Sequence, residues 1–454
     1  MKVEIVSAPS LHKYLRKPAI LFFIFFAFLV LFLFVRMFLS GYIIGSDALG
    51  YYAHLRSILI DGDLQYANEF LDYNPFGHAV PNPYRLTVTD HTPNPYYIGP
   101  ASLWAPFFLV AHAFASASDL FGLDLTPDGY SALYQILIGL GSVVYGMAGL
   151  ALIYKILMLF FQRNEALLAT GLIALGTNVF YYLTIEPTMS HAMSMFAVTL
   201  FAFVWVKSID QRNKNTVILL GFTAGLMILI RPQNVLFLSI LGLEWVGLFK
   251  TESGFFAHWR KKIVEAGFFG LVLLTTLLPQ LIVWKILYGQ FLIQAYEGAS
   301  FEFTDPYLWK SLFSARHGLI SWTPIILLAL AGALLFLRKY PRLGIALLIA
   351  FMLQWYINAS WTDYWWFGES FGSRTYINCS FIFAIGLATL LSSTKRIAVI
   401  MYPLLAALII WNLLFIAQYS MGMLSRSEAV DFRQVLSNQF AIPEIIYRSI
   451  EERL

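Results

Sequence analysis

The chain has 454 residues, of which 59% are hydrophobic and only 12% are charged, and its mean hydropathy is +0.68. A soluble globular chain carries about 25% charged residues, and a single soluble core stops growing beyond roughly 250–300 residues. The composition therefore excludes a soluble enzyme, a disordered linker and a nucleic-acid-binding domain, and it predicts an all-α polytopic membrane protein. The single cysteine, Cys379, excludes an intramolecular disulfide, and the net charge of +4 says little by itself.

The first hydrophobic run, residues 20–39, has the length of about 20 residues that a spanning helix needs. Positively charged residues precede it and no small-residue cleavage site follows it, so we expect a retained helix with a cytoplasmic N-terminus. Further apolar runs predict helices at residues 130–153, 166–183, 190–206, 216–231, 234–249, 263–284, 323–338, 343–358, 376–392 and 397–418.

Lysine and arginine gather in five connections between the later runs, at residues 155–163, 207–214, 250–262, 338–342 and 395–396. All five lie on one side only if residues 101–118 do not cross the bilayer, because a crossing there would reverse every later basic cluster. That segment contains Pro106 and His112, which fits a re-entrant or interfacial helix. We therefore expect eleven crossings, with a twelfth as the alternative, an inner N-terminus and an outer C-terminus.

We expect residues 1–454 to form a single membrane-embedded domain with three outer segments, at residues 41–100, 285–322 and 419–454. Tyr51 and Leu55 recur at helical spacing, so residues 47–60 predict an amphipathic helix on the membrane surface. The C-terminal tail has mixed polarity and predicts one or two short surface helices.

Polar and ionisable residues gather in the outer connections. The segment Gly45–Tyr52 directly follows the first helix, and helix capping by Ser46 or Asp47 is the structural alternative there. The other such segments are residues 185–191, 231–234, 314–318 and 362–374. Ionisable groups beside the hydrocarbon region are costly and usually face an interior cavity, so these segments predict a site that contains both carboxylates and cations.

That combination suits attack of a hydroxyl group on an activated phosphate ester. A carboxylate within hydrogen-bond distance can take the proton of the acceptor, and arginines can hold the phosphate as it leaves. Tyrosines and tryptophans offer flat surfaces for sugar rings, while an interfacial aromatic belt is the alternative reading of Trp355, Trp361, Trp365 and Trp366. His91 and His191 are candidate metal ligands, with a hydrogen-bonded structural role as the alternative.

The order of these features resembles the GT-C membrane glycosyltransferases, and most of all their protein O-mannosyltransferase and aminoarabinose transferase branch. Asp47 matches the first acid of the family's outer-loop motif, and Ala48 stands where a second acid often occurs. The segment His91–Tyr96, HTPNPY, resembles a loosened His-Pro-Pro element, and Glu186 matches an acid of the second outer turn. In the family a juxtamembrane helix follows that element, which agrees with a re-entrant segment at 101–118.

The resemblance implies a GT-C fold and transfer of a sugar from an undecaprenyl- or decaprenyl-type phosphate donor to a lipid or glycan acceptor hydroxyl. It implies an inverting reaction on the periplasmic face of a bacterial cytoplasmic membrane, for cell-envelope glycan, glycolipid or glycoprotein modification. Asp47 would be the base, and Glu186 would orient the acceptor or bind a divalent cation (Mg²⁺ or Mn²⁺), with His191 as a further candidate ligand. Residues expected at the donor phosphate are Arg374, Arg316, His317 and Arg231. Residues expected at the sugar or acceptor are His91, Tyr51, Tyr52, Trp365 and Glu369.

Other functions remain open at this stage. A lipid-linked sugar flippase or transporter would place functional charges near the middle of the bilayer, often with an internal repeat, and the sequence shows neither pattern. A membrane scaffold without catalysis would leave the polar clusters unexplained. An O-antigen polymerase or ligase would use the same carrier chemistry with a diphosphate-linked donor. Membrane lipids are expected partners in each case, and nucleic acid is not.

Overall fold

The structure, a computed structural model, describes residues 16–72, 74, 82–209, 212–247, 255–294, 300–362 and 364–451. Within these ranges the chain forms helices and loops and no β-strand, which confirms the predicted all-α class. Two compact units divide the chain. Unit 1 comprises Met1–Leu152, Tyr182–Leu241 and Lys250–Gly298, and unit 2 comprises Ile153–Tyr181, Gly242–Phe249 and Ala299–Leu454. The assignment of residues 1–454 to a single domain stays a prediction.

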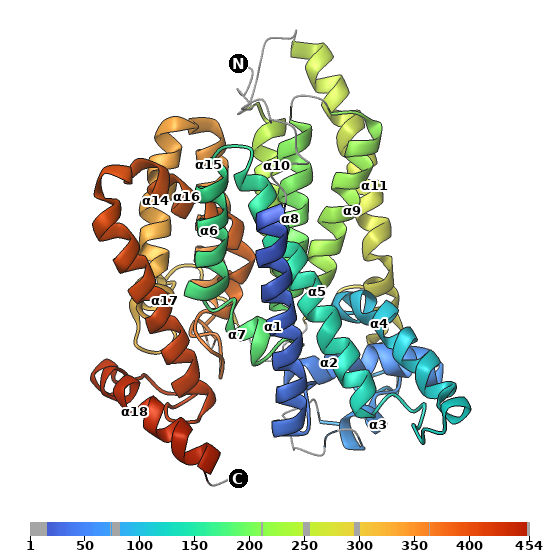
Figure 1. Cartoon of the computed structure of the whole chain (residues 1–454). Helices are drawn as coiled ribbons and strands as arrows, with labels where there is room; N and C mark the ends of the chain where they lie inside the picture. The colour runs from blue at the N-terminus through green and yellow to red at the C-terminus, as the bar shows by residue number, and fades with distance from the viewer. Residues whose placement is uncertain are drawn as a thin grey trace. The chain divides into compact units, whose positions relative to one another are not determined.

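Unit 1 contains the first long helix, the first predicted outer loop and a group of packed helices. Its helices are α1 (Arg16–Ser40), α2 (Asp47–Arg56), α3 (Ala67–Leu71), α4 (Gly99–Ser116), α5 (Ala132–Leu157), α8 (His191–Ser208), α9 (Lys214–Ile230) and α11 (Phe255–Tyr288). α9 packs against both α8 and α11, and α2 packs against α4 (Figure 1). The chain passes between the units within α5, in α7 (Tyr181–Thr184) and in α10 (Leu238–Trp245).

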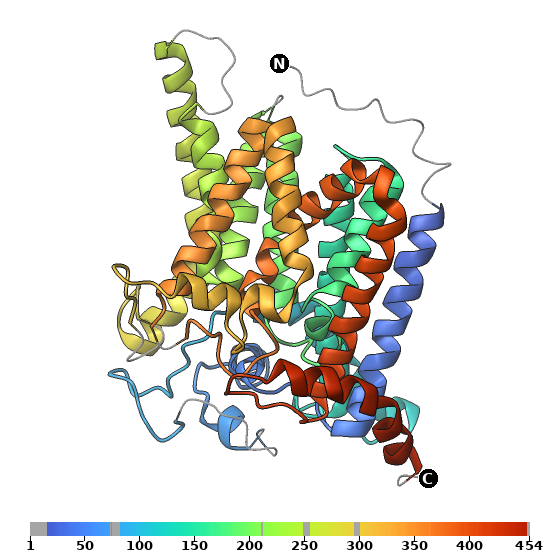
Figure 2. The same ribbon diagram turned by 90° about the vertical axis from the view of Figure 1, so that its left-hand side faces the viewer.

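Unit 2 is a second helical group, which Figure 2 shows mainly in orange and red. Its helices are α6 (Arg163–Gly176), α12 (Leu308–Phe313), α13 (Leu319–Trp322), α14 (Ile325–Lys339), α15 (Pro341–Ser360), α16 (Ser380–Ser393), α17 (Ala398–Ser420) and α18 (Phe432–Glu451). α16 packs against α14 and α6, and α17 also packs against α6. The amphipathic tail helix α18 packs against α17, and its presence agrees with the surface helix predicted for the tail.

Each predicted apolar run contains a helix, but the helices differ in length. In the described ranges, seven are long and apolar enough to cross a membrane: Pro18–Ser40, Ala132–Leu157, His191–Ser208, Lys262–Tyr288, Pro341–Ser360, Arg374–Ser393 and Lys395–Ser420. These helices confirm a multi-pass membrane protein. The count of eleven crossings and the orientation stay predictions. The helix over the predicted re-entrant segment, α4, is not among the seven.

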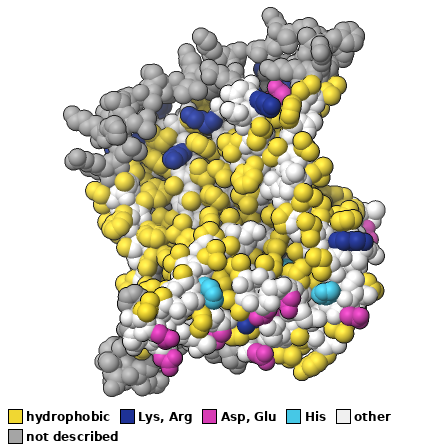
Figure 3. All heavy atoms as spheres, turned by 90° about the vertical axis from the view of Figure 1, so that its right-hand side faces the viewer, with side chains coloured by type: hydrophobic (Ala, Val, Ile, Leu, Met, Phe, Trp, Pro, Cys, Tyr) yellow, Lys and Arg dark blue, Asp and Glu magenta, His cyan; other side chains and the backbone are white. Residues whose placement is uncertain are grey.

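Apolar side chains also cover the outside of the helices, as contact with lipid requires. Figure 3 shows a broad hydrophobic band on one face, with several lysine and arginine side chains above it and most of the visible aspartate and glutamate side chains below it. Helix α11 alone exposes Ile263, Val264, Leu271, Leu274, Leu278 and Ile282. In a soluble protein such a surface would favour aggregation, whereas acyl chains cover it at no cost.

Two glycines set the closest helix contact in unit 2. A Cβ atom at Gly332 of α14 would lie 1.9 Å from the carbonyl oxygen of Gly386 in α16, and a Cβ atom at Gly386 would lie 1.9 Å from the carbonyl oxygen of Ala329. Small residues allow two membrane helices to approach through their backbones, where dispersion contacts replace the missing hydrophobic effect. The α14–α16 pair therefore depends on the absence of a side chain at both glycines.

The helix predicted over residues 47–60 is present as α2 followed by a π-helical turn, Ser57–Asp61. Its predicted setting is wrong: α2 is not a surface helix with a polar face, because every residue from Ala48 to Arg56 is buried. Only the turn exposes apolar side chains, with Ile58 and Leu59 about two-fifths accessible. The recurrence of apolar residues predicted the helix correctly, but the side chains on its opposite face are also enclosed by the folded loop.

His54 fixes one side of α2. Its Nδ1 lies 2.7 Å from the hydroxyl of Tyr66, and its Nε2 lies 2.8 Å from the backbone oxygen of Tyr96. The ring is fully buried, and this burial lowers the pKa of His54 to about 4, although the contact with the Tyr96 backbone opposes the shift. His54 is therefore neutral near pH 7 and holds the segment around Tyr96 against α2.

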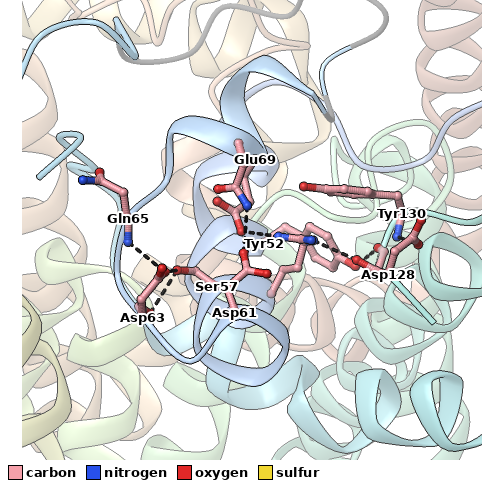
Figure 4. A network of polar contacts seen from close by, with 11 residues as sticks. Tyr52, Ser57, Asp61, Asp63, Gln65, Glu69, Asp128 and Tyr130 are labelled. Carbon is pink, nitrogen blue, oxygen red and sulfur yellow. Dashed lines mark hydrogen bonds and ion pairs between the residues drawn. The ribbon is translucent and has the colours of Figure 1, made fainter. Parts of the chain in front are cut away.

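Arg56 at the end of α2 is the centre of a buried ion network, whose carboxylates and aromatic ring appear in Figure 4. Its Nη1 lies 2.5 Å from Asp61 Oδ2 and 2.9 Å from Glu69 Oε1. Its Nε donates a hydrogen bond of 2.8 Å to the backbone oxygen of Asp128, and its guanidinium lies 4.1 Å from the ring centroid of Tyr130. One side chain thus ties α2 and its π-turn to α3 and to the loop before α5.

Glu69 gives this network a dependence on pH. The carboxylate is almost completely buried, and one of its oxygens, Oε2, has no hydrogen-bond partner. Burial raises the pKa of Glu69 from 4.5 to about 7, and the hydrogen bond from Arg56 offsets only part of that shift. Because the pKa is higher in the folded state than in the unfolded state, the folded protein binds this proton more tightly. The stabilisation is complete below pH 4.5 and is lost as the pH rises through about 7.

We therefore expect Glu69→Gln to flatten the dependence of stability on pH. Between pH 4.5 and 7 the free energy of unfolding of the wild-type protein should fall relative to that of the variant, by on the order of 3 kcal/mol. Unfolding in mixed micelles at a series of pH values measures both curves. Parallel curves would show that Glu69 does not titrate in this range.

Candidate functional site

The candidate site in unit 1 begins at the turn between α1 and α2. Ser46 adopts φ 55°, and its side chain makes no capping hydrogen bond to α2. The structure therefore does not support Ser46 as a helix cap. The next residue, Asp47, is half-buried, and its Oδ1 accepts a hydrogen bond of 3.2 Å from the hydroxyl of Tyr96. The carboxylate thus faces the end of the HTPNPY segment.

Tyr51, one turn further along α2, connects this carboxylate to a second segment. Its ring packs edge-on against the ring of Tyr96, with 5.3 Å between the centroids. Its hydroxyl lies 3.1 Å from the hydroxyl of Ser190, immediately before α8. The predicted outer turn at residues 185–191 is therefore in direct contact with α2.

Arg231, between α9 and the following short helix, completes the contacts. Its Nη1 donates to Ser190 Oγ at 3.0 Å and lies 3.4 Å from His191 Nδ1, and its Nη2 donates to Gln233 Oε1 at 3.3 Å. His191 also packs against the ring of Tyr182. We call the connected residues the unit 1 cluster: Asp47, Tyr51, Tyr96, Ser190, His191 and Arg231. Three of the predicted polar segments meet in it.

The other candidates of unit 1 have different settings. Glu186 lies half-buried in the turn before α8, where its backbone oxygen accepts from the Met189 amide. Tyr52 is fully buried, and its hydroxyl donates to the backbone oxygen of Gly129 beside the Arg56 network. His91 is turned back on its own loop, with Nδ1 2.7 Å from the Thr89 backbone oxygen. Their predicted roles stay predictions.

A metal site has no support among the side chains that the structure describes. No three histidine, cysteine, aspartate or glutamate side chains gather there in a way that could hold a metal ion. Asp47 and His191 belong to the same cluster, but the contacts that connect them run through two tyrosines, a serine and an arginine. No step of the reaction is assigned to a divalent cation, and the predicted cation stays a prediction.

The candidate site in unit 2 is built around His317, whose backbone has φ 61°. Its ring is fully buried between Trp322 and Trp366, with centroid distances of 4.5 and 5.7 Å. Neither ring nitrogen makes a hydrogen bond of normal geometry. Its backbone oxygen accepts a hydrogen bond of 2.5 Å from Ser373 Oγ, which brings the segment before Arg374 against the turn at 314–318.

Two arginines adjoin this histidine. The guanidinium of Arg316 lies 3.7 Å from the ring centroid of Trp366, and its Nε is buried without a partner. Burial lowers the pKa of His317 to about 3, and the positive charges of Arg316 and Arg374 lower it further, while backbone groups at Arg426 and Gly368 oppose the shift. His317 is therefore a neutral hydrogen-bonding group, not a cation. We call Arg316, His317, Trp366 and Arg374 the unit 2 cluster.

The remaining candidates lie near this cluster in sequence but contact other residues. Trp365 packs against the ring of Tyr307, and the ammonium of Lys310 lies 5.9 Å from its centroid. Glu369 is exposed. The structure thus brings Arg316, His317 and Arg374 close to one another, while the predicted roles of these residues and of Trp365 and Glu369 stay predictions.

Sequence reasoning missed three members of the two clusters: Tyr96, Ser190 and Trp366. Tyr96 lies five residues after His91, at the end of the HTPNPY segment, and Ser190 directly precedes His191 in the predicted outer turn. Trp366 had been read as a sugar platform or as part of an aromatic belt, whereas the structure places it under a guanidinium. The available signal was sequence proximity to a predicted site residue: Ser190 precedes His191, Trp366 follows Trp365, and Tyr96 ends the segment that begins at His91.

Because Arg316 stacks on Trp366, we expect a guanidinium and an ammonium group to differ in function at position 316. We expect Arg316→Lys to keep the charge but to weaken donor binding by about fivefold, because an ammonium lacks the planar face and the paired donors of a guanidinium. Titration of a short-chain polyprenyl phosphate into wild-type and variant protein measures the dissociation constants. The exposed Arg396→Lys is the matched control, and equal affinities in Arg316→Lys and wild type would remove the stacked arginine from the site.

Comparison with known proteins gives a match to a family sequence model and weak likenesses to solved structures. Residues 135–285 match the sequence model of the family described as dolichyl-phosphate-mannose-protein mannosyltransferase. A search of curated proteins gives no match. Among solved structures, the archaeal oligosaccharyltransferase AglB from Archaeoglobus fulgidus, solved in complex with an inhibitory peptide and a dolichol-phosphate, is similar at 11% identity with a TM-score of 0.40.

That likeness covers 88% of this chain and 50% of the AglB chain, so this chain spans half the length of the solved one. A TM-score below 0.5 does not define residue correspondence, and no role is transferred from AglB. The family match covers about a third of the chain and includes His191 and Arg231 of the unit 1 cluster. Over residues 135–285, that match confirms the predicted resemblance to the GT-C membrane glycosyltransferases, and Asp47 and the segment His91–Tyr96 lie outside the matched residues.

Proposed function

We propose that this chain transfers a sugar from a polyprenyl-phosphate donor to a hydroxyl group of a lipid or glycan acceptor. The observation that carries the proposal is the contact chain within unit 1 that runs from Asp47 through Tyr96, Tyr51 and Ser190 to Arg231. A carboxylate and a guanidinium in one network are the groups that glycosyl transfer from a phosphate ester uses. The family match at residues 135–285 supports the same class of reaction.

In this proposal Asp47 takes the proton of the acceptor hydroxyl. The acceptor oxygen then forms a bond to the anomeric carbon while the bond from that carbon to the phosphate oxygen breaks. The polyprenyl phosphate leaves with the bonding electrons, and displacement in one step inverts the anomeric centre. Glu186 would orient the acceptor. A base of this kind contributes about 10²–10⁴-fold to the rate when it reaches the hydroxyl directly.

The negative charge of the leaving phosphate needs donors that are positioned before the reaction. The candidate donors are Arg316 and Arg374 within unit 2 and, as a separate candidate, Arg231 within unit 1. His317, which is neutral near pH 7, would contribute a hydrogen bond and no charge. Since these residues belong to two units, separate substitutions of Arg231 and of Arg374 test the contribution of each unit.

We further propose that the reaction takes place on the periplasmic face of a bacterial cytoplasmic membrane, in the modification of cell-envelope glycans, glycolipids or glycoproteins. The multi-pass helices and the positive residues of the predicted inner connections support this location. The donor would be of the undecaprenyl or decaprenyl type, held by its isoprenoid tail along the apolar helices.

The test uses the full-length protein in liposomes with a panel of polyprenyl-phosphate sugars, and mass spectrometry follows the release of free polyprenyl phosphate. Release that depends on the protein and on an added acceptor extract would establish the transferase and name the donor. Arg374→Ala is compared with the wild-type protein in the same assay. Because Arg374 is proposed to bind the donor phosphate, the variant should raise the donor KM more than it lowers kcat. Release only from a diphosphate-linked donor would place the chain with O-antigen polymerases and ligases instead.

The same liposomes distinguish the alternative class. A flippase would move the labelled lipid-linked sugar between the leaflets, where reduction by an impermeant reagent detects it, and would release no polyprenyl phosphate. That outcome would overturn the proposed transfer.

A further inference from the structure

The C-terminal helix α18 has a polar half and an apolar half. At 100° per residue, Val435, Leu436, Phe440 and Ile442 fall on one side of the helix. Arg433, Gln434, Ser437, Asn438 and Glu444 fall on the other side. A helix with this division binds along a boundary between an apolar and a polar phase.

Only part of the apolar half packs against the protein. Val435 and Ile442 are buried, and α18 contacts α17. Gln418 Nε2 in the last turn of α17 donates a hydrogen bond of 2.9 Å to the backbone oxygen of Val435, and the rings of Phe415 and Phe432 lie 6.4 Å apart. These contacts fix α18 at the end of α17.

The rest of the apolar half is uncovered. Leu436 is 51% exposed and Phe440 is 81% exposed, and they lie one helical turn apart on the same side. Transfer of these side chains from water into lipid would be favourable by about 0.8 kcal/mol for each methylene group that leaves the water. The uncovered surface therefore needs an apolar neighbour, and its position decides which one.

That position is the end of a membrane-crossing helix. α17 lies within one of the candidate spans, Lys395–Ser420, and much of its side is exposed, including Val399 at 82%, Ile400 at 67% and Ile410 at 57%. Figures 1 and 2 show that α18 lies across the end of α17 and does not continue it. The candidate span ends at Ser420, and α18 is attached to this last turn through Gln418.

We propose that α18 is an interfacial helix whose Leu436–Phe440 face inserts into the boundary between acyl chains and headgroups of the same bilayer. The occupant of that face is lipid, because α18 is attached to the end of a candidate membrane span whose own apolar side chains are exposed. The polar half, with Ser437 and Glu444, faces water. The inference concerns attachment to the membrane and does not depend on the proposed sugar transfer.

The test uses the full-length protein in phosphatidylcholine–phosphatidylglycerol liposomes with one environment-sensitive label. The chain has a single cysteine, Cys379, which is fully buried, so cysteines introduced by Phe440→Cys and Ser437→Cys in a Cys379→Ala background each give one labelled site. We expect the label at position 440 to emit at shorter wavelength and to be quenched by shallow nitroxide lipids about threefold more than the label at position 437. Leu436→Cys should behave like Phe440→Cys.

Equal quenching at positions 440 and 437, or efficient quenching of the label at position 440 by aqueous iodide, would overturn the proposal. Shielding of position 440 from both quenchers would show that protein, such as a second copy of the chain, covers the face, and would also overturn it. If Cys379→Ala impairs folding, the wild-type background serves, with unsubstituted protein as the blank for labelling of Cys379.

Discussion

Asp47→Asn should lower turnover by about 10²–10⁴-fold while donor binding changes little, because the amide keeps the size of the side chain but cannot take a proton. The hydrogen bond from Tyr96 to Oδ1 can still form, so α2 and its first turn should keep their structure. Initial rates and donor dissociation constants, measured in the same liposomes, separate the loss of a base from the loss of a binding group.

The matched control is Asp119→Asn, which changes an exposed carboxylate in the short helix after α4. It should leave both quantities unchanged. Full turnover by Asp47→Asn would remove the role assigned to Asp47, and Glu186→Gln would then be the next variant to test. A parallel loss of turnover and of donor affinity would point to a folding defect, which the melting temperature in detergent detects.

Arg56→Ala should destabilise unit 1 by about 3–5 kcal/mol, the loss expected when one partner of a buried ion pair is removed. The buried carboxylate of Glu69 would lose its hydrogen bond, and the backbone oxygen of Asp128 would lose its donor. Tyr130 would also lose the guanidinium above its ring. Titration with a denaturing detergent measures the free energy of unfolding for both proteins.

Removal of both partners supplies the decisive comparison. A buried ion pair often contributes little beyond an apolar pair of similar volume, so the double variant Arg56→Met, Glu69→Leu should recover most of the loss. The exposed Arg396→Ala is the control for a simple change of charge. If Arg56→Ala alone is as stable as the wild-type protein, the Arg56 network does not stabilise the folded loop at residues 41–100.

The helices were predictable because an apolar run in a membrane has few other ways to pair its backbone groups. Where runs end, the prediction was less accurate. The run at 166–183 breaks after Gly176, and the run at 376–392 begins with a 3₁₀ segment, Arg374–Cys379. These departures are made by tertiary contacts, such as the hydrogen bonds from Asn412 to the backbone oxygens of Leu175 and Thr177, which no local pattern contains.

The site was predictable only in part for the same reason. Local composition identified Asp47, Arg231 and the segment around Arg316, because charged residues next to apolar runs are rare and costly. It did not identify the pairing of Tyr51 with Ser190, which joins residues 139 positions apart. Nor did it indicate the role of Arg56, although few basic residues occur in a loop rich in acids.

The two glycines at the α14–α16 contact limit how this protein can change its sequence. Even alanine at Gly332 or Gly386 would place an atom inside the neighbouring backbone, so the two helices would have to separate along their length. Saturation mutagenesis should therefore find positions 332 and 386 as intolerant as any charged position, although neither residue carries a functional group. In unit 2, geometry within the helix pair therefore constrains sequence variation in addition to the chemistry of the loops.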